Sequence, residues 1–138
     1  MNAALLDGRG LLARLIGFRL YSVVFVMDYV QLCFDGDHPE DRPVFNCYVW
    51  PVIDMSSHTV ADGEIGYAGG YRSLIPRHVT GTSVGEQGGL RLEFGNATLI
   101  LRPAMAEIVG AEIARLSGFA DGRWTAWRPG EPPFKYLV

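Results

Sequence analysis

The stretch 88–103 constrains the fold most, because it has the pattern of a complete β-hairpin. Apolar residues alternate with Arg91 and Glu93, which is typical of a strand with one buried face. A turn at Gly95-Asn96 follows, and then a second apolar run that ends at a proline. An earlier stretch, 30–51, has a similar order of strand, loop, strand and proline. The sequence therefore predicts two similar antiparallel meanders.

The predicted fold is mainly β, with α+β as the alternative. We expect an antiparallel roll or flattened barrel built from two three-stranded meanders, with short helices at its margins. The length of 138 residues fits a single domain, 1–138. Within it we expect a first meander at 18–53, a linker loop at 54–73, a second meander at 74–103, and a covering segment with an aromatic tail at 104–138.

The first meander should contain strands at 18–26, 29–34 and 44–53. Pro51 lacks a backbone N–H group, so the end of the third strand should lie at a sheet edge or a bulge. If two halves pack face to face, the core should include Leu20, Val24, Val26, Leu32, Phe34, Val49, Leu92, Phe94, Leu99 and Leu101.

Helices are expected only at the margins. The apolar spacing over 9–16 fits a short amphipathic helix. Pro103 suits a helix start, so we expect a helix at 104–110, with a strand allowed from 111 onward. A turn at 120–122 should lead into a strand at 123–128.

The two meanders can be interpreted as copies of one unit. Leu74-Ile75 repeats Leu15-Ile16 at an offset of 59, and Phe94 repeats Phe34 at an offset of 60. Antiparallel meanders share such alternation without common ancestry, so coincidence is the alternative explanation.

Composition excludes several classes of protein. Hydrophobic residues make up 49% and charged residues 20%, which is globular, and the net charge is −3. This balance gives no basis for binding nucleic acid or an anionic membrane. No apolar run is long enough to span a membrane, and no secretory signal is recognisable at the start. We therefore expect a cytoplasmic protein.

No metal or cofactor is expected. His38, His58 and His78 lie in separate segments without the spacing of a zinc motif. The carboxylates of 35–41 depart from the calcium loop of an EF-hand, since Pro39 occupies a ligand position. Solvated loops explain both groups. Cys33 and Cys47 should face each other across a hairpin and act as small hydrophobic residues rather than as a redox pair.

The C-terminal segment combines aromatic residues with an arginine, a composition enriched at the energetic centres of interfaces. These side chains could form a subunit contact, or they could close the open end of the core. The residues are Trp124, Trp127, Arg128, Phe134 and Tyr136.

Several segments resemble small conserved hypothetical proteins of mycobacteria and related actinobacteria. They are 112–131, 11–18 and 47–51. That group has no assigned activity, so the resemblance implies only a compact cytoplasmic domain.

The leading functional hypothesis is a non-enzymatic binding or protein-interaction module that associates with itself as a homodimer. No nucleophile, base and orienting residue converge in the sequence, and exposed strand edges offer a route to a symmetric pair. The alternative is a carrier or enzyme for a small anionic molecule, with a pocket between the halves gated by the 54–71 loop. Its lining would include Tyr67, Tyr71, Arg72, Arg77 and His78.

Overall fold

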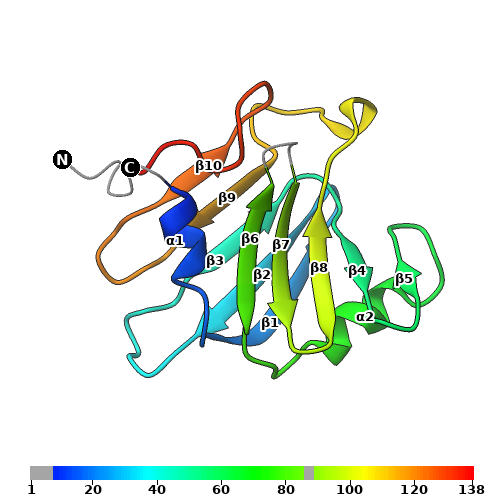
Figure 1. Cartoon of the computed structure of the whole chain (residues 1–138), viewed down its shortest axis with the longest axis horizontal. Coiled ribbons are helices and arrows are strands. Elements are labelled where there is room, and N and C mark those ends of the chain that lie inside the picture. Colours follow the sequence, from blue (N-terminus) through cyan, green and yellow to red (C-terminus); the bar gives the residue numbers. More distant parts are fainter. Residues whose placement is uncertain (1–7, 86–88) are drawn as a thin grey trace.

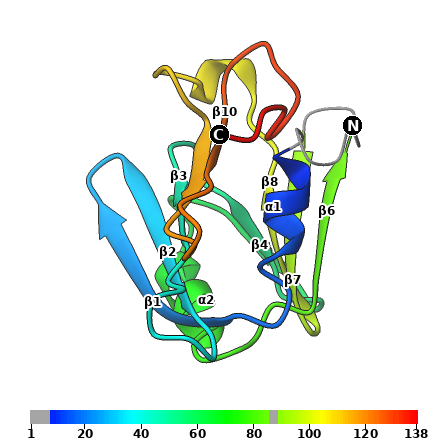
Figure 2. The same cartoon turned by 90° about the vertical axis from the view of Figure 1, so that its left-hand side faces the viewer.

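Two five-stranded antiparallel sheets form the protein in a computed structural model, which describes residues 8–85 and 89–138. Figure 2 shows the sheets as two layers. Sheet A has the order β1 (Arg19–Val26), β2 (Tyr29–Asp35), β3 (Val44–Cys47), β9 (Ala114–Ser117), β10 (Thr125–Trp127). Sheet B has the order β5 (Thr59–Val60), β4 (Val52–Asp54), β8 (Ala97–Leu101), β7 (Gly89–Phe94), β6 (Gly81–Gly85). The prediction of a mainly β, antiparallel fold is confirmed.

Each sheet combines one meander with two strands from the other half of the chain (Figure 1). The predicted strand at 44–53 is wrong for this reason. Its first part is β3 in sheet A, and its last residues begin β4 in sheet B. The chain crosses between the sheets just before and at Pro51, where the missing N–H group cannot support a continuous ladder.

The helices differ from the prediction at two places: α2 (Tyr67–Ser73) was not expected, and the helix expected at 104–110 is shorter. α1 (Arg9–Ala13) confirms the predicted N-terminal helix. The expected helix at 104–110 is only a 3-10 turn, η2 (Met105–Glu107), and the strand allowed after 111 is β9. The 54–73 segment is not an irregular linker, because it contains β5 and α2. The second meander accordingly begins at β6 rather than at residue 74.

The architecture repeats along the chain. Each half runs through a short helix, three meander strands, and a pair of strands placed in the opposite sheet. Leu15 and Leu74 both follow the helix, and both are fully buried. Leu32 pairs with Phe45 in sheet A as Leu92 pairs with Leu99 in sheet B. Common ancestry of the two sequences stays a prediction, but the halves have the same arrangement.

The core lies between the sheets and includes most of the residues that the alternation indicates. Eight of them are buried: Leu20, Leu32, Phe34, Val49, Leu92, Phe94, Leu99 and Leu101. The prediction that Val24 is a core residue is wrong, since 41% of it is exposed, and Val26 is only half-buried. A β-bulge between Leu20 and Ser22 shifts the alternation by one residue, so that Val23 rather than Val24 packs against the core.

The two cysteines do not face each other. Cys33 pairs with Val44, and Cys47 pairs with Val30. Paired residues point to the same side of a sheet, so this register places the cysteines on opposite faces. Both are free and buried, and burial raises the pKa of each thiol.

Candidate functional site

The four edges of the two sheets differ in how they are protected. β5 has two residues and β10 has three. The backbone of Trp124, just before β10, exchanges two hydrogen bonds with Val138. α1 packs beside β6, as both views show (Figures 1 and 2). β1, with eight residues, is the long edge that none of these devices covers.

Part of the β1 edge is occupied by the chain itself. Leu20 donates its N–H to the carbonyl of Arg77, and Val79 donates to the carbonyl of Phe18. Within the described residues no strand pairs with the outer side of residues 22–26. Phe25 is 47% exposed and Met27 is 95% exposed. The stretch 20–27 contains no charged side chain, so this edge is both apolar and open.

The outer face of sheet A carries three polar side chains in the middle of one cross-strand row. The row runs from β1 to β10 through Val24, Gln31, Asn46, Arg115 and Ala126. The amide of Gln31 donates to the side-chain oxygen of Asn46 at 3.1 Å. Cross-strand polar pairs of this kind fix the register of the sheet and leave a hydrophilic surface.

A groove of about 450 Å³ lies at the end of this face, and we call it the sheet A groove. Its volume falls in the range of about 300–1,000 Å³ that is usual for ligand sites. It is formed by the β1–β2 turn, the residue after β3, the segment before β9, β9 itself, and the residue after β10. The lining residues are Asp28, Tyr48, Val109, Gly110, Ala111, Glu112, Arg115 and Arg128.

The charges of the sheet A groove are partly fixed in place. The guanidinium of Arg115 donates to both carboxylate oxygens of Glu112, at 3.0 and 2.7 Å, and its Cζ atom lies 4.3 Å from the centroid of the Trp124 ring. Hydrogen bonding from Arg115 lowers the pKa of Glu112, and burial raises the pKa of Tyr48. Because the Glu112–Arg115 pair is internally neutral, Arg128 and Asp28 are the charges the groove can offer to a ligand.

A smaller cavity of about 220 Å³ lies at the other end of sheet A. Arg19 holds Asp35 by two hydrogen bonds of 2.9 and 2.7 Å, and His78 lies beside them. The hydrogen bond from Arg19 lowers the pKa of Asp35. Both carboxylate oxygens of Asp35 are thus bonded to Arg19, so they are not free to bind a cation.

The five residues predicted to line a pocket between the halves do not gather in one cavity. Tyr67 and Tyr71 are buried in the core, where their hydroxyls lie 2.7 Å apart and Tyr67 donates to the carbonyl of Pro51. Arg77 donates to the side chain of Asn96 at 2.8 Å. Arg72 is exposed on α2, and His78 belongs to the 220 Å³ cavity.

The aromatic tail divides between core and surface. Trp127 and Phe134 are buried, and Phe134 packs against Phe45 at 5.9 Å between ring centroids. Trp124 covers Arg115, and Arg128 lines the sheet A groove. Tyr136 is 49% exposed. The tail therefore closes the core, which was one of the two roles considered for it, and an interface role for the exposed residues stays a prediction.

Metal ligands do not converge in the part of the chain that the structure describes: no group of three or more His, Cys, Asp or Glu side chains could hold an ion there. His38 and His58 are in exposed loops, as expected.

Sequence reasoning missed Tyr48, Glu112 and Arg115. The ion pair has a visible signal, since Glu112 and Arg115 are three residues apart. No sequence signal marks Tyr48, because it lies in the apolar run that was predicted to be one continuous strand.

Comparisons of the chain with protein-family models, with curated proteins and with solved structures find no match. No helix within residues 8–85 and 89–138 is long and apolar enough to cross a membrane. The resemblance to actinobacterial proteins and the cytoplasmic location stay predictions.

Proposed function

We propose that the protein is a non-enzymatic interaction module that forms a homodimer through the edge of β1. The observation that carries this proposal is the contrast among the sheet edges. Three are short, bonded or covered. Among the described residues, none pairs with the outer backbone groups of 22–26 in β1, which lie beside exposed apolar side chains. Monomeric proteins usually protect such an edge with charges, prolines or a covering element.

A second copy of the chain fits this edge. Two β1 strands related by a twofold axis at Val24 would pair antiparallel and join two sheets into one of ten strands. The faces of the two sheets would then match, with Val24 against Val24 of the second copy. Burial of Phe25 and Met27 would add hydrophobic stabilisation.

The experiment is light scattering coupled to size exclusion, with native mass spectrometry, on the natural chain and on Val24→Lys. The natural chain should be a dimer. In the variant, two lysines would face each other on the twofold axis, and the dissociation constant should rise at least about tenfold, or about 1.4 kcal/mol.

Val138→Lys is the matched control, because Val138 is 51% exposed and bonds to Trp124 beside β10, at the opposite edge of sheet A from β1. It adds the same charge and should leave the dimer intact. A natural chain that stays monomeric at high concentration, or a V138K variant that dissociates as readily as V24K, would contradict the proposal.

The second candidate function is a carrier of a small ligand in the sheet A groove, favoured by its volume and by Arg128, which forms no ion pair with another described residue. Native mass spectra of protein taken directly from its source cells should then show an adduct. Arg128→Ala should lose that adduct without changing the subunit count, which separates this function from dimer formation.

A further inference from the structure

A second concave surface lies on the outer face of sheet B, and we call it the sheet B hollow. It is lined by β6, β7, β8 and the residue after β8. On the outer face, Ser83, Arg91 and Ile100 form one cross-strand row, and Gly85 pairs with Gly89 in the next, where Arg102 lies beside Gly89. The hollow has a volume of about 160 Å³, which suits a small chemical group rather than a whole drug-sized ligand.

The hollow exists because two glycines face each other in the register. Gly85 pairs with Gly89, so no side chain fills that position on either strand. A Cβ atom on Gly89 would lie 3.3 Å from Nε of Arg102, which shows that the arginine side chain lies across this glycine. A Cβ atom on Gly85 would have its nearest neighbour 3.6 Å away. The floor of the hollow is therefore formed by backbone atoms of Gly85 and Gly89, and the Arg102 side chain covers it on the Gly89 side.

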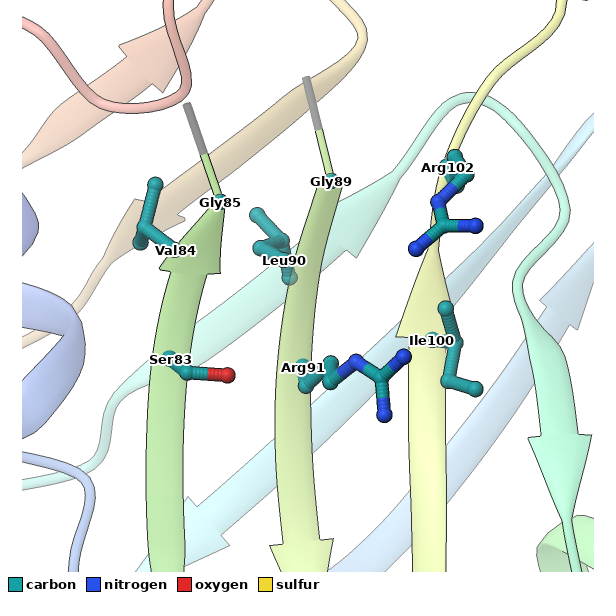
Figure 3. A pocket seen from close by; sticks show the side chains of 8 residues that line it. All are labelled: Ser83, Val84, Gly85, Gly89, Leu90, Arg91, Ile100 and Arg102. Carbon is teal, nitrogen blue, oxygen red and sulfur yellow. The ribbon is translucent and has the colours of Figure 1, made fainter. Parts of the chain in front are cut away.

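Two arginine side chains lie at the hollow. Figure 3 shows Arg91 extending toward β8, with its guanidinium beside Ile100, and Arg102 coming in from the end of that strand. The Ser83 hydroxyl points from β6 toward the near end of the Arg91 side chain. Among the described residues neither arginine has an ion pair or a side-chain hydrogen bond. Arg14, Arg19 and Arg115, by contrast, each hold a carboxylate.

Diagonal neighbours on a sheet face are close enough for long side chains to interact, and like charges there repel each other. Among the lining residues that the structure describes, none is acidic, so none of them compensates the repulsion. The lining offers donors from β6, β7 and the residue after β8: two guanidinium forks and one hydroxyl. A carboxylate, with one charge and two oxygens, can be satisfied by a single arginine. A phosphoryl group carries about two negative charges and three acceptor oxygens, which match this larger set of donors.

We infer that the sheet B hollow binds the phosphoryl group of a small phosphorylated molecule, held by Arg91, Arg102 and Ser83 above the Gly85–Gly89 floor. This site is independent of dimer formation through β1, because β1 is an edge of the other sheet.

The test is a titration of the full-length, isotopically labelled chain with inorganic phosphate, followed by NMR. The amide signals of Gly85 and Gly89 and the side-chain signals of both arginines should shift and saturate. Arg91→Gln and Arg102→Gln should each weaken phosphate binding at least tenfold. Arg72→Gln removes an exposed arginine from α2 and should leave the affinity unchanged.

Gly85→Val provides a variant that touches neither arginine. Its side chain should enter the hollow and abolish phosphate binding. The melting temperature should stay close to that of the natural chain, since a Cβ atom at this position meets its nearest neighbour at 3.6 Å, an ordinary contact distance. Shifts that do not saturate, or an affinity that G85V leaves unchanged, would overturn the inference. Binding to phosphatidic acid vesicles without any response to free phosphate would also overturn the inference, because it would indicate a general surface charge effect instead of a phosphoryl site in the hollow.

Discussion

Tyr71 shows how a polar group is accommodated inside the core. Tyr67 uses its hydroxyl proton on the Pro51 carbonyl, so the Tyr71 hydroxyl is the donor to Tyr67 at 2.7 Å. Phe25 packs edge-on against the Tyr71 ring. Both tyrosines were expected to line a pocket between the halves that the 54–71 loop would gate. Their burial depends on α2, which that pattern did not indicate.

The tyrosine pair should make the fold sensitive to alkali. Burial raises the pKa of both hydroxyls above the ordinary value of about 10. Below pH 10 the two hydroxyls keep their protons in the folded and the unfolded chain, so their contribution to the free energy of unfolding is complete. Above pH 10 the unfolded chain loses protons that the folded chain retains. The free energy of unfolding should therefore fall above pH 10. Tyr71→Phe should reduce that slope by up to about 1.4 kcal/mol per pH unit, as measured by urea denaturation between pH 8 and 12.

The same variant should cost only about 1 kcal/mol at pH 7, since Tyr67 keeps its bond to Pro51. Tyr136→Phe, at an exposed position, serves as the control and should leave the slope unchanged. Equal slopes for the natural chain and for Y71F would show that Tyr71 ionises freely.

At the scale of elements, the strands with clear alternation were predictable. β2, β7 and β8 were found near their expected bounds because one face of each is apolar. The break between β3 and β4 was not predictable, since apolar residues continue through it while the chain passes from one sheet to the other. The C-terminal segment after β10 has no regular structure, yet its Phe134 is fully buried against Phe45.

Phe134→Ala should therefore destabilise the fold by about 3–5 kcal/mol, the usual cost of removing a buried aromatic ring. Tyr136→Ala, two residues later and 49% exposed, should change stability by no more than about 0.5 kcal/mol. Chemical denaturation of the two variants gives the comparison. Similar small effects for both would mean that the tail lies on the surface rather than in the core.

At the scale of the whole molecule, the exchange of strand pairs ties the halves together. Sheet A needs β9 and β10 from the second half, and sheet B needs β4 and β5 from the first. Neither half can complete a sheet with its own strands.

Cutting the chain between residues 62 and 63, in an exposed loop, should give two fragments that are unfolded when separate. Mixing them should restore the native structure, because each supplies the strands that the other lacks. Dispersion of amide signals in NMR spectra reports both states. A first fragment with native-like dispersion by itself would contradict this dependence.

The sequence by itself determined the antiparallel class, the two meanders and most of the core, because alternation with period two is a local property of each strand. It did not determine which sheet receives β4, β5, β9 and β10, or that α2 brings two tyrosines inside. Those outcomes depend on pairing between residues far apart in the chain. The sheet A groove, the open β1 edge and the sheet B hollow also arise from such pairing, because each joins side chains of several strands, and only the tertiary structure decides which strands are neighbours.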